Sequence, residues 1–233
     1  MHNLADAGAP GQADLVDYLQ AWQCRVTIDV SGYARLTMLR MAVKAIALDS
    51  GSGISIIPVA VEHAAKLAAL VERNLDHLGR YLPLVASLSA PEAARAHLEA
   101  AVAGADKGEV LEWHLFSGGA LWGAIRVKNI DPDDRKAEIG YFIGSECAGK
   151  GIASCAVRAV LAYCFGSLQL NRMELRCAST NERSIRVAER LGFTREGMLR
   201  QAERLNGVFI DQLVYGLLRA EFLHQAAGAR HCA

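Results

Sequence analysis

A glycine-rich run over residues 144–153 has the residue types and spacing most suggestive of chemistry in this chain. It reads Gly-Ser-Glu-Cys-Ala-Gly-Lys-Gly-Ile-Ala and joins a strand-like segment to a strongly periodic helix. Because glycine adopts backbone conformations that other residues avoid, successive N–H groups in such a turn can converge on one anion. The following helix directs the positive end of its dipole at the same point. The run predicts a phosphate-binding loop, and a purely structural turn is the alternative.

One well-known phosphate loop, that of nucleoside-triphosphate hydrolases, follows the pattern G-x-x-x-x-G-K-[ST]. The chain satisfies this pattern from Gly144 to Lys150 but has Gly151 where the hydroxyl that holds Mg²⁺ should stand. The next strand-like run, residues 173–177, also ends without the aspartate expected as the second metal partner. The sequence therefore disfavours nucleotide hydrolysis, and we expect no metal ion in the site.

The elements that must position this loop are readable from their periodicity. Residues 137–143 place Ala137, Ile139, Tyr141 and Ile143 on one face, which is typical of a half-buried strand. After the loop, apolar residues recur at helical spacing over 152–163, so we expect an amphipathic helix that ends at Gly166. A further strand is predicted over 172–177, and a short helix from Asn181 to Leu191 should follow it.

Composition limits the functional classes. The chain has 233 residues, 52% of them hydrophobic, which suffices for one domain with an appendage. Lysine plus arginine and aspartate plus glutamate each number 25, so no basic surface for nucleic acid is indicated. The chain lacks an apolar run of membrane-spanning length and a signal peptide pattern, so we expect no membrane partner and a cytoplasmic location.

The six cysteines form no C-x-x-C pair and show no dense spacing, which indicates reduced thiols. Cys155 lies on the apolar stripe of the predicted helix and Cys164 borders it, so both are interpreted as core residues. Cys147 stands inside the loop and could be reactive. Since no histidine or asparagine partner is evident for it, we interpret it as incidental.

Several blocks in a fixed order resemble the RimJ/RimL branch of the GNAT acetyltransferase family, and the resemblance extends from Ile54 to about Phe222. The blocks are residues 64–78 with an N-x-x-H-L turn, Tyr81-Leu82-Pro83, Glu138-Ile139-Gly140-Tyr141, the loop 148–153, Asn181-Glu182-Arg183-Ser184, Arg190-Leu191-Gly192-Phe193, residues 196–203 and Asn206-Gly207. Within the branch, Arg200-Gln201-Ala202-Glu203 is most similar to the ribosomal-protein-serine acetyltransferases.

The resemblance implies an α/β (α+β) GNAT fold, in which helices flank a mixed, mostly antiparallel sheet. Acetyl-CoA, as co-substrate, would lie in a splay between the strands at 137–144 and 172–178. The residues implied to hold it are Phe142, Ile143, Ala148, Gly149, Lys150, Gly151, Ile152, Ala153, Ser154 and Asn181. Ala148 departs from the family's Q/R-x-x-G-x-G/A pattern, which should weaken the grip without abolishing it, because the loop works mainly through backbone N–H groups.

Catalytic roles follow from the same resemblance. Glu203 occupies the position of the base, and Ser184 that of the acid that protonates the departing thiolate. On residue type alone, Glu203 would be interpreted as a solvated surface glutamate, and Asn181 and Ser184 as ordinary helix-capping residues. Glu138 is the rival base, because other GNAT branches place a carboxylate on that strand.

The acceptor side is less well defined. In the branch, the first helix and its turn line the acceptor pocket, which makes Asn74 and His77 weak candidates for substrate contacts. The histidines His63, His77 and His114 lack metal-ligand spacing and are interpreted as structural or pocket-wall residues. Arg183, Arg186 and Arg190 are interpreted as a solvated helix face, from which one side chain could reach the 3′-phosphate of the coenzyme.

The favoured function is therefore acetyl-CoA-dependent transfer to a primary amine, namely the N-terminal α-amine of a protein of ribosomal type. A small-molecule amine, such as a polyamine, amino acid or antibiotic, is the alternative acceptor, and a coenzyme-binding module without turnover is the contrasting hypothesis. Relatives in this family are often homodimers, so a homodimer is expected.

The chain divides near a linker-like stretch, residues 49–53. We predict an N-terminal extension of uncertain structure over 1–53, the acetyltransferase domain over 54–222 and a C-terminal tail over 223–233. Within the extension, Asp14 to Trp22 could form a short helix, and a later translation start at Met38 or Met41 is left open.

Overall fold

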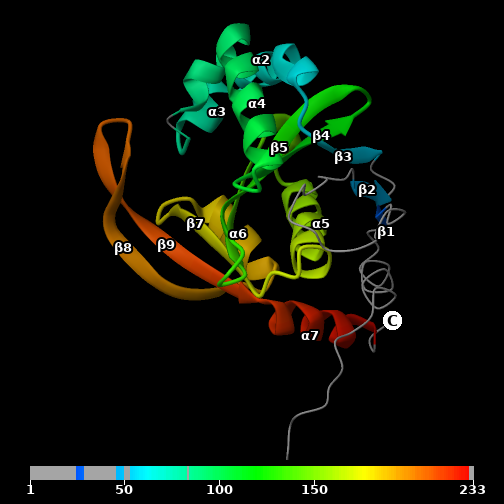
Figure 1. The fold of residues 1–233 in the computed structure, drawn as a ribbon. Coiled ribbons are helices and arrows are strands. Elements are labelled where there is room, and N and C mark those ends of the chain that lie inside the picture. The colour runs from blue at the N-terminus through cyan, green and yellow to red at the C-terminus, as the bar shows by residue number, and fades with distance from the viewer. Residues whose placement is uncertain (1–24, 29–45, 50–52, 83, 231–233) are drawn as a thin grey trace, which may run out of the picture.

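The structure is a computed structural model that describes residues 25–28, 46–49, 53–82 and 84–230 (Figure 1). The helix considered over residues 14–22 and the alternative starts at Met38 and Met41 lie outside these ranges. Within the described ranges, no helix is both long enough and apolar enough to cross a membrane.

A single nine-stranded sheet organises the described part of the chain, with strand order β1-β2-β3-β4-β5-β6-β7-β9-β8. The strands are β1 (Arg25–Ile28), β2 (Ile46–Asp49), β3 (Ile54–Pro58), β4 (Leu111–Ser117), β5 (Ala120–Asp131), β6 (Lys136–Ile143), β7 (Arg172–Ala178), β8 (Thr194–Leu205) and β9 (Val208–Leu218). Only the β6–β7 pair among them is parallel, which confirms the predicted mixed, mostly antiparallel sheet.

Helices cover both faces of this sheet (Figure 1). They are α2 (Ala64–Arg73), α3 (Leu75–Gly79), α4 (Pro91–Asp106), α5 (Ile152–Gly166), α6 (Glu182–Arg190) and α7 (Arg219–Arg230), with short 3-10 turns η1 (Val61–His63), η2 (Val85–Ser89) and η3 (Ser145–Cys147). Apolar side chains of α5, α6 and α7 join the larger core on one face. Those of α2 and α4 form a second core with Phe116 and Leu121 on the other face.

The predicted elements around the loop are confirmed, with one difference in α5. This helix begins at Ile152 and ends at Gly166, but it is buried on nearly all sides, whereas one apolar stripe was predicted. The reason is that it contacts β2, β5, β6 and α6, so residues off the predicted stripe, such as Val157, are also covered. Cys164 is fully buried, whereas Cys155 is half-buried and less of a core residue than predicted.

Two features bear on the predicted domain boundaries. Strands β1 and β2 of the N-terminal extension pair in sequence onto β3 and lengthen the sheet at that edge. Helix α7 runs from Arg219 to Arg230, across the boundary proposed at residue 222. The division into extension, domain and tail stays a prediction.

The β6–β7 pair is the opening in the sheet that positions the site. These strands are joined only at their first residues, where Lys136, Ala137 and Glu138 lie beside Arg172, Met173 and Glu174. Beyond this point the ladder stops, so β6 from Ile139 onward and β7 from Leu175 onward separate. On the far side of β7, the long β8–β9 hairpin curves back toward α3 (Figure 1).

Candidate active site

The glycine-rich loop has the backbone conformation that anion binding requires. Gly149 and Gly151 have φ angles of 79° and 75°, in the left-handed region that favours glycine. A Cβ atom at either position would meet nothing within 4 Å, so the space in front of both is open. Gly151 is the N-cap of α5, and the first N–H groups of a helix lack intrahelical partners. The loop therefore fits a phosphate group.

Ser154 lies in the first turn of α5 and is 6% exposed. Its hydroxyl is buried and has no hydrogen-bond partner among the described residues. Most buried hydroxyl groups in proteins are hydrogen-bonded, so this one is an exception. Lys150, by contrast, is exposed at the rim of the loop.

Asn74 ties the end of α2 to the start of the loop. Its side chain is buried, and its Oδ1 accepts hydrogen bonds from the backbone N–H and the hydroxyl of Ser145, both at 2.8 Å. Its amide nitrogen donates to the Leu70 carbonyl at 3.0 Å. Because both its amide oxygen and its amide nitrogen are hydrogen-bonded to protein groups, Asn74 links the end of α2 to η3.

A pair of hydroxyl groups spans the splay between β6 and β7. The Tyr141 hydroxyl on β6 lies 3.2 Å from Ser184 Oγ on α6. Asn181 caps α6 by accepting the Ser184 backbone N–H at 3.2 Å, so the Ser184 side chain is free for the contact with tyrosine. Burial raises the pKa of Tyr141 to about 12, and the Ser184 hydrogen bond opposes this shift. Tyr141 therefore keeps its proton near neutral pH.

Sequence reasoning identified Ser184 and Asn181 but gave Tyr141 no chemical role. The alternation along β6 could have indicated this role. Tyr141 carries the hydroxyl group on a strand face that is otherwise apolar and packs toward α5. Tyrosine on such a face generally finds a partner for its hydroxyl when it is buried. Phe142 and Ile143 divide between the two faces, since Phe142 packs against the second core and Ile143 against the first.

Glu203 lies near the end of β8, and its carboxylate Oε2 accepts a hydrogen bond of 2.7 Å from the amide of Gln212 on β9. Its side chain is half-buried. Gln212 in turn pairs with Ala178, the last residue of β7, directly before the loop that leads to α6. The hairpin thus carries Glu203 to the end of β7 at which the splay opens.

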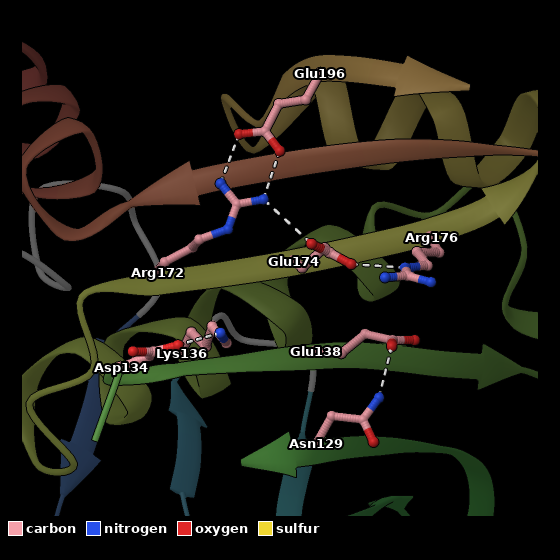
Figure 2. Close-up of polar contacts among 8 residues, drawn as sticks. All are labelled: Asn129, Asp134, Lys136, Glu138, Arg172, Glu174, Arg176 and Glu196. Atoms are coloured by element: carbon pink, nitrogen blue, oxygen red, sulfur yellow. Dashed lines mark hydrogen bonds and ion pairs between the residues drawn. The ribbon is translucent and has the colours of Figure 1, made fainter. Parts of the chain in front are cut away.

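Glu138, the rival base, lies in the part of β6 that is still paired with β7. Its carboxylate forms an ion pair of 2.9 Å with Lys128. It also accepts a hydrogen bond of 3.0 Å from Asn129 (Figure 2). It projects from the face opposite to Ile139 and Tyr141, as alternation predicts. Both contacts tie its carboxylate to β5, below the splay.

Contacts between segments far apart in the sequence border the region between α3 and the β8–β9 hairpin, where the acceptor was predicted. The Tyr81 hydroxyl donates to the Thr180 carbonyl at 2.8 Å, joining the turn after α3 to the loop after β7. The Asn206 amide at the tip of the β8–β9 hairpin donates to the Gly79 carbonyl at 3.1 Å. His77 is half-buried on α3 in the same region. Beside the Glu203 bulge, a hollow of about 690 Å³ is lined by Arg200, Gln201 and Asp211.

The surroundings of Cys147 and of the three α6 arginines do not indicate a chemical role. Cys147 is 2% exposed, and burial raises the pKa of its thiol, so a reactive thiolate is disfavoured. Arg183, Arg186 and Arg190 are exposed, and Arg186 pairs with Glu182 one turn away at 3.3 Å. Among the described residues, no group of three or more histidine, cysteine, aspartate or glutamate side chains could hold a metal ion.

The strands β6 and β7 separate beside the glycine-rich loop that begins α5. Residues 54–194 match the family model described as the acetyltransferase (GNAT) domain. The chain therefore belongs to the GNAT family and is an N-acetyltransferase of its RimJ/RimL branch.

Relatives and a solved structure agree with this assignment. The chain is 37% identical over 68% of its length to the putative ribosomal N-acetyltransferase YdaF of Bacillus subtilis, covering 87% of that protein. It is 32% identical over 67% of its length to the ribosomal-protein-serine acetyltransferase of Escherichia coli, covering 88% of it. A ribosomal L7/L12 α-N-protein acetyltransferase, solved with coenzyme A, matches 72% of the chain and 94% of its own at 26% identity, with a TM-score of 0.69.

Proposed function

We propose that this N-acetyltransferase uses acetyl-CoA to acetylate the N-terminal α-amine of a protein of ribosomal type. The observation that carries the proposal is the phosphate loop beside a splay spanned by the Tyr141–Ser184 pair, with Glu203 on the neighbouring hairpin. Two named relatives act on ribosomal proteins according to their names, which supports the same acceptor class here. A homodimer and a cytoplasmic location stay predictions.

The residues proposed to hold the coenzyme follow the same geometry. Backbone N–H groups of the loop from Ala148 to Ala153 and the Ser154 hydroxyl would bind its pyrophosphate, while Phe142, Ile143 and Asn181 would line the splay for its pantetheine arm. When bound, acetyl-CoA supplies an acetyl thioester that an uncharged amine can attack. The protein must therefore deprotonate the amine, hold it against the thioester, and protonate the thiolate that leaves.

Glu203 is proposed as the base, acting on the amine directly or through one water molecule. An N-terminal α-amine has an ordinary pKa of about 7.7–8.0, against about 10.4 for lysine. A carboxylate therefore removes the proton of an α-amine more easily near neutral pH than that of a lysine side chain. The Gln212 hydrogen bond occupies Oε2 of Glu203, and Oε1 stays available to the proton. Glu138 fits this role less well, because Lys128 and Asn129 already bind its carboxylate.

Ser184 is proposed as the acid. Its hydroxyl can donate to the departing thiolate while it accepts from Tyr141, 3.2 Å away. Hydrogen bonds in such a chain strengthen one another in a low-dielectric site. Tyr141 would thereby stabilise the oxygen of Ser184 as its proton leaves.

An N-terminal peptide suits the acceptor side better than a polyamine does. The hollow beside Glu203 is lined by one arginine and one aspartate together with Gln201, so its lining carries no excess of negative charge. A polycation would favour several carboxylates there. The Asn206–Gly79 contact bounds the same side and would constrain the chain that follows the amine.

The test is release of free coenzyme A thiol from acetyl-CoA in the presence of Ser-initiated peptides, ribosomal proteins, polyamines or aminoglycosides. We expect release with the peptides or ribosomal proteins, and a rate lower by about 10²- to 10⁴-fold in Glu203→Gln. Mass spectrometry of the product should place the acetyl group on the α-amine. Release stimulated only by polyamines or aminoglycosides would contradict the proposed acceptor, and full activity of Glu203→Gln with loss in Glu138→Gln would move the base to Glu138.

A further inference from the structure

We infer that the dipeptide Asp211-Gln212 is a positioning element that sets the place of Glu203 relative to the loop before α6, the helix that carries Ser184. This inference rests on the proposed role of Glu203 as the base. Neither residue was singled out by the sequence patterns. Three hydrogen bonds from these two adjacent residues on β9 reach both sides of the site.

The first bond fixes the carboxylate itself. Gln212 Nε2 donates to Glu203 Oε2 at 2.7 Å, across the β8–β9 pair. Both side chains are half-buried, and a hydrogen bond to a charged group there is stronger than one between neutral groups. Since one oxygen is held, the rotamer of Glu203 is set and Oε1 has a defined direction.

The second bond fixes the backbone that carries Glu203. Leu199 pairs with Gln212 and Glu203 pairs with Ile210, so residues 200–202 of β8 bulge out opposite the single residue Asp211. Gln201 in this bulge has a φ of 48°, a left-handed conformation that is costly for a residue with a side chain. The Asp211 carboxylate accepts the Gln201 N–H at 2.8 Å. A strained conformation persists only where neighbouring groups stabilise it, and the hydrogen bond to Asp211 stabilises this one.

The third bond ties the same dipeptide to the other side of the splay. The Asp211 carbonyl accepts the Ser179 N–H at 2.9 Å, at the end of β7. Ser179 lies two residues before Asn181, the residue that caps α6 and orders Ser184. One dipeptide is therefore bonded to the proposed base, to the bulge that presents it and to the loop that presents the proposed acid.

Gln212→Met tests the first bond, because methionine keeps the length of the side chain and lacks the donor. We expect kcat to fall by about 10- to 100-fold, the loss typical of a hydrogen bond to a charged group, with little change in KM for acetyl-CoA or peptide. Gln225→Met on α7 is the matched control, since that amide donates to the Gly192 carbonyl outside the hairpin. We expect it to keep the wild-type kcat.

A double-mutant cycle separates positioning from a structural role. If Gln212 acts through the Glu203 carboxylate, Gln212→Met should lower kcat no further in the Glu203→Gln background. A structural role would give a similar loss in both backgrounds. Equal losses would overturn the inference while the proposed function stands, whereas a fully active Glu203→Gln would overturn the proposed base first.

Asp211 is tested by two substitutions that differ in one acceptor. Asp211→Asn keeps an oxygen for the Gln201 N–H and should retain most of kcat, whereas Asp211→Ala removes it and should lower kcat by about 10-fold. Thermal unfolding of both variants checks that they are folded. A loss of kcat in Asp211→Asn as large as in Asp211→Ala would show that the carboxylate acts by its charge, which would overturn the positioning role of Asp211.

Discussion

Two polar clusters on this sheet are built from similar groups but differ in how they meet water. The first lies on β4 beneath α4, where Glu112 is 3% exposed and His114 is fully buried. Glu112 lies 3.3 Å from His97, 3.8 Å from His114 and 3.4 Å from Arg126, and His114 lies 3.1 Å from His63 through their Nδ1 atoms. The second cluster is the Tyr141–Ser184 pair and the Glu203–Gln212 pair, which border the open splay.

Because of this difference, we expect the cluster around Glu112 to contribute to stability and the residues at the splay to contribute to catalysis. In the cluster around Glu112, the carboxylate is 3% exposed and its partners come from α4, β4 and β5, which pack on one another, so protonation and packing are linked. In the splay, the Tyr141–Ser184 pair and the Glu203–Gln212 pair each join two half-buried side chains. We therefore expect changes around Glu112 to alter folding, and changes around the splay to alter turnover in a folded enzyme.

The largest effect is expected for Glu112→Ala, which removes a buried carboxylate and leaves His97 and Arg126 without their partner. His97 and Arg126 are 26% and 40% exposed and can be solvated, so we expect the loss of a hydrogen bond to a charged group, about 1.5–3 kcal/mol. Urea unfolding should show that loss, while kcat of the fraction that remains folded should be close to wild type. Glu99→Ala, an exposed glutamate on α4, is the matched control and should change stability by less than about 0.5 kcal/mol. A stable Glu112→Ala enzyme with a collapsed kcat would reverse the comparison.

The next effect belongs to the splay. Ser184→Ala should lower kcat by about 100-fold, because the departing thiolate loses its proton donor, and leave the free energy of unfolding nearly unchanged. The helix cap survives, since it uses the Ser184 backbone N–H. Single-turnover kinetics with a Ser-initiated peptide would measure the loss, with Ser167→Ala at the end of α5 as a control.

Tyr141→Phe tests whether Ser184 or Tyr141 is the proton donor. If Tyr141 only supports Ser184, its loss of kcat should be smaller than that of Ser184→Ala. A larger loss in Tyr141→Phe would make Tyr141 the proton donor and Ser184 its partner.

The two clusters also differ in how far the sequence could predict them. The loop, α5, β6 and β7 follow from local periodicity, and the glycines at 149 and 151 stand where left-handed backbone is needed. By contrast, the Tyr141–Ser184 contact joins residues 43 apart, and the Asn74–Ser145 contact joins residues 71 apart. Such contacts depend on how strands and helices pack, which the periodicity of one segment does not contain.

The register of the β8–β9 pair and the burial of both faces of β4 could not be predicted from the sequence either. The three-residue bulge over 200–202 brings Glu203 to Gln212, yet no turn residue in that stretch marks it. Strand β4 alternates Glu112 and His114 with Leu111, Trp113 and Leu115, which is typical of a strand with one face in water. In the structure both faces are buried, because η1 and α4 cover the polar one. His63 and His114, interpreted from the sequence as structural or pocket-wall residues, contact each other in this cluster.

A pH effect of intermediate size is expected from the buried cluster. Burial lowers the pKa of His114 to about 4, although Glu112 opposes the shift, while His63 and His97 add to it. Between pH 4 and 6.5 the unfolded chain binds more protons than the folded one, so this contribution is complete above about pH 6.5 and is lost as the pH falls toward 4. The free energy of unfolding should drop by about 2 kcal/mol from pH 7 to pH 5 on this account.

The measurement is urea unfolding at pH 7 and pH 5 for wild type and His114→Gln, with His77→Gln as a control on α3. Burial also lowers the pKa of His63, which adds to the slope in the same direction. We expect the slope to become shallower in His114→Gln and to stay unchanged in His77→Gln. An unchanged slope in His114→Gln would mean that other groups carry the acid sensitivity.

The smallest effect is expected for charges that lie on the open surface of the sheet, which completes the comparison. Arg172 donates to both oxygens of Glu196, at 2.6 and 2.5 Å, and the pair crosses β9 over Gly216 (Figure 2). In Gly216→Ala, the added Cβ would clash with the Glu196 carboxylate and the Arg172 guanidinium, so the pair should separate. These side chains are 25% and 40% exposed, and exposed pairs contribute about 1 kcal/mol or less.

A double-mutant cycle with Glu196→Gln isolates that contribution from the strain of the added methyl group. Glu196→Gln should cost less than about 1 kcal/mol in wild type, less still at high salt, and nothing measurable in Gly216→Ala. Neither variant should change kcat. If the coupling energy instead approached the roughly 1.5–3 kcal/mol expected for Glu112→Ala, burial of the carboxylate would not be what separates Glu112 from Glu196, and the comparison between the two kinds of cluster would fail.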